Sequence, residues 1–196
     1  ARLGGLELAK DKLRTIDRLI ISGMGTAYIA ASVGEYMLEE YAGIPVEAEN
    51  AAEFRYRKPI IDGNTAFLAI SQSGETADTL GALREAKEKG AYTLGIVNAV
   101  GSTVARETDA GVYNHAGSEI GVASTKAFTS QLAVLALLTL YFGRQRDMSL
   151  VTGKRIAKEL AHIPDLVRKI LDQADLVAAL AEKYRRFSNF LYIGRK

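Results

Sequence analysis

The sequence predicts an α/β protein, in which helices cover both faces of a parallel β-sheet. Along residues 1–115, short β-branched or aliphatic runs alternate with longer helical patterns, an order typical of this class. Two of the runs, Ala66–Ile70 and Tyr92–Val97, are almost wholly apolar, as strands buried on both faces are. The chain has 196 residues, 48% apolar and 24% charged, a globular composition and a length that suffices for a buried core.

The expected elements follow one another in a regular order. Five strands are predicted, at Arg18–Ile21, Val46–Ala48, Ala66–Ile70, Tyr92–Val97 and Gly111–Asn114. Three helices are predicted, at Tyr28–Tyr41, Thr76–Lys89 and Thr125–Tyr141. Glycine takes the left-handed conformation that ends a helix, so Gly43 and Gly90 mark the ends of the first two. Five parallel strands between two helical layers make a three-layer, flavodoxin-like sandwich.

The third of these helices raises the question of a membrane span. Its segment Leu132–Phe142 is almost wholly apolar, but it supplies only about half of the roughly 20 residues that a bilayer crossing needs. We therefore expect a buried helix and no membrane partner.

The pattern changes after Gly143. Residues 144–150 are typical of a connector, and two amphipathic helices follow, at Val151–Ile163 and Pro164–Tyr184, because proline suits the first turn of a helix. The stretch Phe190–Ile193 is strand-like and runs into a glycine, the junction at which an α/β unit opens its next ligand loop. Two interpretations stay open: this strand completes the sheet, or it begins a second domain.

Composition excludes several kinds of function. The net charge is only +2, which gives no basis for a nucleic-acid partner. The absence of cysteine excludes disulfides, thiolate metal sites and a cysteine nucleophile, and two histidines, His115 and His162, make a histidine-rich metal site unexpected. We expect no metal and no cofactor. The first residues lack a signal-peptide pattern, so a cytoplasmic protein is the expectation.

Three loops lie where a parallel sheet binds its ligands, between the end of a strand and the start of a helix. The first, residues 22–26, contains a Gly-x-Gly turn that permits close approach of backbone to ligand, although a plain tight turn explains it equally well. The third, residues 117–126, is rich in small residues. It ends at Lys126, a cation that opposes the dipole of the following helix.

The second loop, residues 71–76, carries the strongest signal. It places three hydroxyl groups, an amide and a glycine around one helix N-terminus, and neutral donors there suit the phosphate of a small metabolite. Capping of the helix is the competing explanation, but one cap uses only one hydroxyl. The basic stretch Glu53–Lys58 is interpreted as a solvated or interface surface.

Four stretches of the chain resemble the isomerase part of the glutamine–fructose-6-phosphate aminotransferases: residues 43–47 (GIPVE), 52–57 (AEFRYR), 71–80 (SQSGETADTL) and 119–128 (EIGVASTKAF). The resemblance implies the first of two sugar isomerase (SIS) domains. Residues 1–145 would form this phosphosugar-binding domain, residues 146–187 its helical extension or linker, and residues 188–196 the start of the second SIS domain. A glutaminase domain and the rest of the second SIS domain would lie outside the chain, and the family suggests a homodimer.

The resemblance also assigns roles to residues. Fructose-6-phosphate or glucosamine-6-phosphate would bind by its phosphate to Ser71, Gln72, Ser73 and Thr76, and by its sugar to Gly25, Thr26, Val122 and Ser124. The proton-transferring Glu, the ring-opening His and the Schiff-base Lys of the family belong to its second SIS domain and C-terminal tail. We therefore expect no catalytic residue here. At Ala27 the family usually has Ser, which removes one possible ligand bond.

Two other functions remain as alternatives. A stand-alone aldose–ketose isomerase would need a base in this chain, with Glu119 or His115 as the candidates. A sugar-phosphate sensor would need an attached DNA-binding helix-turn-helix, and residues 1–13 are too short to supply it.

Overall fold

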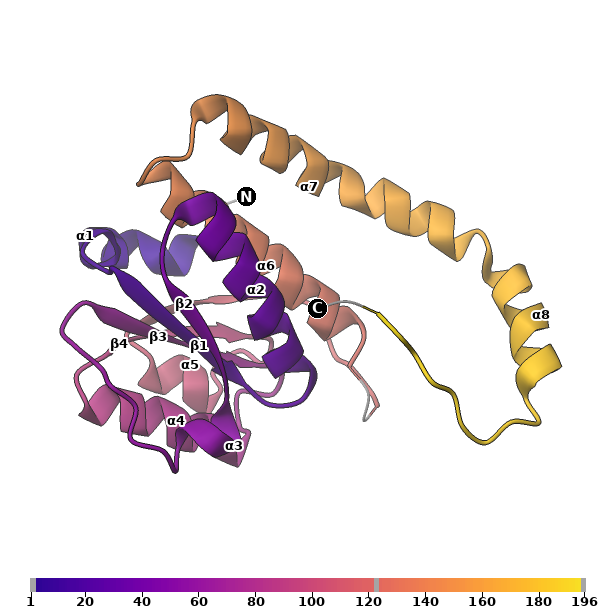
Figure 1. Ribbon diagram of the computed structural model, residues 1–196, viewed down its shortest axis with the longest axis horizontal. Coiled ribbons are helices and arrows are strands. Elements are labelled where there is room, and N and C mark those ends of the chain that lie inside the picture. The colour runs from indigo at the N-terminus through magenta and orange to yellow at the C-terminus, as the bar shows by residue number, and fades with distance from the viewer. Residues whose placement is uncertain (1–2, 122–123, 195–196) are drawn as a thin grey trace. The chain divides into compact units, whose positions relative to one another are not determined.

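The computed structural model describes residues 3–121 and 124–194 (Figure 1). The chain divides into two compact units, Ala1–Ala157 and Lys158–Lys196. The first contains one parallel sheet in the order β2-β1-β3-β4-β5. Its strands are β1 (Arg18–Gly23), β2 (Val46–Asn50), β3 (Thr65–Ser71), β4 (Tyr92–Val97) and β5 (Ala110–Tyr113). All five predicted strands are therefore confirmed, and the central strand β3 is buried along its whole length.

Helices cover both faces of this sheet, which confirms the predicted three-layer sandwich (Figure 1). On one face lie η1 (Gly4–Ala9), α1 (Lys10–Arg14), α2 (Thr26–Ala42) and α6 (Lys126–Arg144), and on the other lie α3 (Ala51–Phe54), α4 (Ala77–Glu88) and α5 (Thr103–Glu107). Successive strand residues point to opposite faces. Accordingly Ile20 and Phe67 belong to one buried cluster, and Ile21 and Leu68 belong to the other.

The helix α6 is a core element, as expected. In the ranges that the structure describes, it alone is long and apolar enough to cross a membrane, and half of its most apolar stretch is buried inside the protein. Leu135, Leu138 and Phe142 pack into the cluster that α6 shares with α2 and the sheet. The buried half of the apolar run therefore belongs to the core on that face of the sheet.

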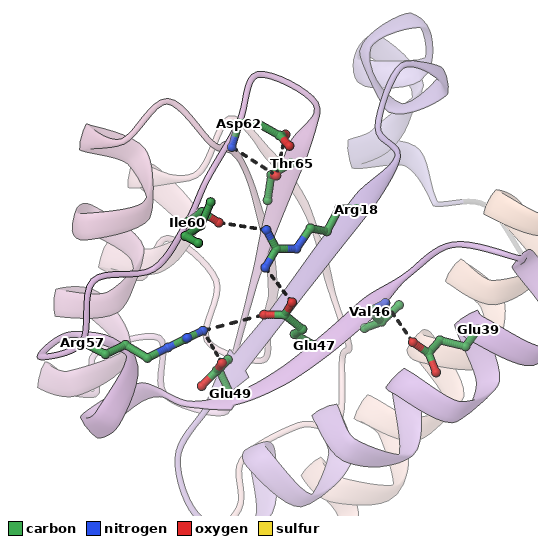
Figure 2. A network of polar contacts seen from close by, with 9 residues as sticks. All are labelled: Arg18, Glu39, Val46, Glu47, Glu49, Arg57, Ile60, Asp62 and Thr65. Carbon is green, nitrogen blue, oxygen red and sulfur yellow. Dashed lines mark hydrogen bonds and ion pairs between the residues drawn. The ribbon is translucent and has the colours of Figure 1, made fainter.

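Ion pairs fasten the edge of the sheet at β2 (Figure 2). Arg18 on β1 pairs with Glu47 on β2 (2.6 Å between Nη2 and Oε1) and donates to the carbonyl oxygen of Ile60 (2.9 Å). Arg57 pairs with both Glu47 and Glu49. Through Arg57, the basic stretch before Pro59 therefore makes ion pairs with the edge strand.

The C-terminal helices differ from the prediction. One helix, α7 (Leu150–Leu171), continues through Pro164 without a break. The next helix, α8, comprises Ala174–Tyr184. Proline removes one backbone hydrogen bond, but the apolar spacing continues in register across it, with Leu160, Ile163 and Val167 at intervals of three and four residues. The expected boundary at Pro164 was wrong because a continuous amphipathic face overrides a single breaker.

The strand expected at Phe190–Ile193 does not form within the described residues. This stretch is irregular, and its four side chains are 60–92% exposed. A strand requires a neighbouring strand to complete its hydrogen bonds, and none of the five sheet strands pairs with it. The division at residues 145 and 187, and a second domain beginning at residue 188, remain predictions.

Candidate ligand-binding site

Two loops meet at the carboxyl edge of the sheet. The strands β1 and β3 are direct neighbours, with Ser22 opposite Ala69, so the loops that follow them lie together. They border a cavity of about 190 Å³, smaller than the ~300–1,000 Å³ of sites for drug-sized ligands and therefore suited to a small metabolite. Its walls are Met24, Thr26, Ala27, Ile70, Ser71, Gln72, Ser73, Thr76, Thr79, Glu119, Gly121, Ser124 and Gln131.

The hydroxyl groups of the second loop shape the loop itself. The Gly74 N–H donates to Ser71 Oγ (2.9 Å), and the Glu75 N–H donates to Ser73 Oγ (3.2 Å). Thr76, the N-cap residue of α4, shares a hydrogen bond with Ser71 Oγ (3.3 Å) and makes no side-chain cap bond. Capping therefore does not account for these hydroxyls, and the first amides of α4 stay available to an anion.

Backbone bonds hold this loop from behind. The carbonyl oxygen of Gln72 accepts from the N–H groups of Asn98 and Ala99 (3.3 and 3.2 Å), and that of Gly74 accepts from the Val104 N–H (3.0 Å). Gly74 has φ of +64°, and a Cβ there would lie 2.1 Å from Ser102 Oγ. Only glycine fits this position, which explains the residue in the middle of the loop.

Glu75 turns away from the cavity. Its carboxylate accepts from the Thr103 N–H at the start of α5 (2.7 Å), and this hydrogen bond lowers the pKa of Glu75. The carboxylate of Glu75 is therefore hydrogen-bonded to the start of α5, and Glu75 does not line the cavity.

The first loop contributes backbone conformation and small side chains. Gly25 is the N-cap residue of α2, with φ of +55° and ψ of −124°, a combination that favours glycine, and no side chain caps this helix. Thr26 and Ala27 line the cavity, whereas Gly25 itself lies beside its wall. The Gly-x-Gly turn thus positions the lining residues that follow it.

The third loop closes the cavity from α6. Glu119 Oε1 accepts from the N–H groups of Thr125 (2.7 Å) and Lys126 (2.9 Å), and Glu119 Oε2 accepts from the Ser124 hydroxyl (3.0 Å). These bonds, the Thr125 amide first, lower the pKa of Glu119. Glu119 thus serves as the cap of α6. The predicted sugar-contacting residue Val122 lies outside the described residues.

Six of the eight predicted site residues therefore border one cavity: Thr26, Ser71, Gln72, Ser73, Thr76 and Ser124. Two lining residues that sequence reasoning missed are buried and polar, Thr79 (0% exposed) and Gln131 (2% exposed). Neither Thr79 Oγ1 nor Gln131 Oε1 has a hydrogen-bond partner among the described residues. The only sequence signal for Gln131 is a polar residue within an apolar helix.

Groups for a metal or for base catalysis are not gathered in the part of the chain that the structure describes. No cluster of three or more His, Asp or Glu side chains lies there. His115 is exposed, has φ of +50° and does not line the cavity. Of the two candidate bases, only Glu119 reaches the cavity, and its oxygens are already bonded to α6.

The sequence of this chain is similar to those of known aminotransferases. The glutamine–fructose-6-phosphate aminotransferases of Chlorobaculum tepidum and Thermus thermophilus are each 50% identical to this chain, over 193 and 191 residues. Those matches cover 98% and 97% of this chain but only 31% and 32% of the relatives. The chain therefore spans about a third of the length of these curated relatives.

A solved structure and a family profile point the same way. The C-terminal domain of glucosamine-fructose-6-phosphate aminotransferase from Francisella tularensis superposes with a TM-score of 0.86 and 36% identity, covering 91% of this chain and 50% of that one. The profile of the SIS domain matches residues 12–141, which include the whole sheet and the three loops that border the cavity. This chain belongs to the SIS domain family.

Proposed function

We propose that this chain is the first SIS domain of a glutamine–fructose-6-phosphate aminotransferase and binds fructose-6-phosphate or glucosamine-6-phosphate by the phosphate group. One observation carries the proposal. The N-terminus of α4 opens uncapped beside a cavity whose wall holds Ser71, Gln72, Ser73 and Thr76. Free amides and the helix dipole favour a negative charge at that point.

The chemistry of the cavity favours a phosphate monoester. No Lys or Arg is among its lining residues, so recognition rests on neutral hydroxyl and backbone donors. A nucleoside triphosphate normally brings a metal ion and a cationic side chain. A small phosphosugar needs neither, and it fits the size of this cavity.

The same cavity supports binding without catalysis. Isomerisation between a ketose and an aldose needs a base beside the first two carbons of the sugar. Glu119 is bonded to the α6 amides and has a lowered pKa, which makes its carboxylate a poor proton acceptor. Ser71, Gln72, Ser73 and Thr76 would hold the phosphate, and Thr26, Val122 and Ser124 would contact the sugar next to the Gly25 turn. Catalytic groups would come from the second SIS domain.

The whole enzyme would transfer ammonia from glutamine to fructose-6-phosphate and form glucosamine-6-phosphate. The glutaminase and second SIS domains would lie outside these 196 residues, with the second SIS domain starting near residue 188. Apolar side chains of α7 and α8, such as Ile170 and Leu176, are 66% and 59% exposed, as faces that pack against a further domain would be. We also propose a cytoplasmic homodimer.

A binding experiment tests the phosphate assignment. Titration calorimetry with fructose-6-phosphate on the 196-residue chain is expected to show binding that Ser73→Ala weakens about fivefold, since one hydrogen bond is worth about 1 kcal/mol. The exposed Ser188 provides the matched control, Ser188→Ala, which should leave the affinity unchanged. Equal affinity of the Ser73→Ala and Ser188→Ala variants would remove the second loop from the phosphate site.

A further inference from the structure

The side chain of Gln131 is buried and also lines the cavity. It belongs to the second turn of α6, between the core residues Ala127 and Leu135, and is 2% exposed. Its Oε1 atom has no hydrogen-bond partner among the described residues. Buried amides without a partner are rare because they lose their hydrogen bonds to water and regain none.

The surroundings of Gln131 indicate what the missing partner is. Gln131 lines the same cavity as the Ser71–Thr76 loop, but it belongs to α6 and not to that loop or to α4. The other polar side chains that the third loop and α6 bring to this cavity are Glu119 and Ser124, which bond to each other. Of these three side chains, only that of Gln131 has a buried polar atom without a hydrogen-bond partner among the described residues. The Ser124 oxygen can still accept a hydrogen bond from a sugar, so Gln131 adds a second polar contact and not the sole one.

The position of the phosphate then decides what Gln131 meets. A phosphosugar anchored at the N-terminus of α4 directs its carbon chain and hydroxyl groups away from that helix end. A primary amide both donates and accepts, so it matches a hydroxyl group in either orientation. Inorganic phosphate at α4 has no carbon chain, so it places no sugar hydroxyl group away from that helix end.

We propose that Gln131 binds a hydroxyl group of the sugar, and that this bond lets the site distinguish a sugar phosphate from inorganic phosphate. The proposal rests on the function proposed above, because it takes the phosphate of the same ligand to lie at α4. Gln131 is then a specificity-determining residue contributed by the buried helix of the fold.

The test compares two ligands on one variant. Gln131→Leu keeps the size of the side chain and removes its polar atoms. We expect the affinity for fructose-6-phosphate to fall about five- to tenfold, the value of one hydrogen bond, with unchanged affinity for inorganic phosphate. Because the variant also removes a buried oxygen without a partner, its melting temperature should stay the same or rise.

A matched control separates binding from burial. Ser22 on β1 is also fully buried, and its Oγ also lacks a partner among the described residues, but it does not line the cavity. Ser22→Ala should therefore leave both affinities unchanged. Gln131→Met, a flexible side chain of similar length, repeats the measurement if the leucine variant folds poorly.

Each outcome has a distinct meaning. Equal weakening of both ligands, with a lower melting temperature, would show that Gln131 only supports the loop structure and would overturn the proposal. Unchanged affinity for fructose-6-phosphate would overturn it as well, while leaving the phosphate site intact. A wild-type chain that binds no sugar phosphate would instead reject the proposed function itself, and with it the ligand of Gln131.

Discussion

The helices α4 and α6 both begin at the cavity, and their N-termini are used in opposite ways. At α4, the threonine in the N-cap position turns to Ser71 and leaves the first amides without a side-chain cap. At α6, the carboxylate of Glu119 already accepts from the first amides. Both ends carry the same partial positive charge. The difference teaches that an anion site depends on whether the chain supplies its own anion at the helix end.

Because of this difference, the two helix ends at the cavity differ in their attraction for an anion. The phosphate of the proposed phosphosugar ligand would be attracted to α4 and repelled by the carboxylate at α6, so such a ligand would have one favourable orientation. Variants at and near the two helix ends test this difference.

The largest effect is expected from Gly74→Ala in the loop before α4. A side chain at φ of +64° costs about 1–2 kcal/mol, and overlap with Ser102 adds about 1–3 kcal/mol. We expect the free energy of unfolding, measured in urea, to fall by about 2–5 kcal/mol and phosphate binding to be lost.

The control is Gly63→Ala, since Gly63 lies in an exposed turn where a Cβ meets no atom within 4 Å. This variant should keep the stability and affinity of the wild type. If Gly74→Ala retained full affinity, the open end of α4 would not depend on the loop conformation.

A smaller effect is expected from Glu119→Gln, which weakens the cap of α6. Because the pKa of Glu119 is lowered, its stabilisation is complete above the ordinary value of 4.5 and is lost as the pH falls through the lowered value. The variant should be less stable at pH 7, and its disadvantage should shrink on acidification. Denaturant titrations at several pH values measure this.

The exposed Glu88 on α4 gives the comparison variant, Glu88→Gln. It should follow the pH profile of the wild type. A constant gap between wild type and Glu119→Gln down to pH 3 would contradict the carboxylate cap.

The smallest effect is expected from Ala27→Ser in the first turn of α2. Ala27 lines the cavity and is 8% exposed, so the new hydroxyl can reach a ligand. One added hydrogen bond is worth about 1 kcal/mol, or a few-fold tighter binding of fructose-6-phosphate by calorimetry. Ala133→Ser, on the exposed side of α6, should have no effect. Weaker binding by Ala27→Ser would show that the wall there is closed to a hydroxyl.

The sheet and the loop before α4 could be predicted because their signals are local. Apolar runs such as Ala66–Ile70 report strands directly, and the loop hydroxyls stand next to one another in sequence. Elements of four to six residues, such as α3 and η1, are too short to show a helical period.

The rest of the site depends on contacts between distant segments. Glu119 bonds amides six and seven residues away, so as a candidate base it could not be distinguished from a helix cap. Thr79 and Gln131 belong to different helices and share a cavity only after folding. Pro164 is the opposite case: the local signal predicts a helix boundary, but the amphipathic pattern that continues on both sides of it keeps α7 in one piece.

The bonds that hold the loop of Gln72 and Gly74 join backbone to backbone. These hydrogen bonds do not involve the side chains of Asn98, Ala99 or Val104. Substitutions at these three positions can therefore occur during evolution without loss of the bonds. A loop held in this way would lose little conformational freedom on binding the proposed ligand, which would keep the entropic cost of binding small. Relatives can therefore diverge around this strand end and still present the same arrangement of amides.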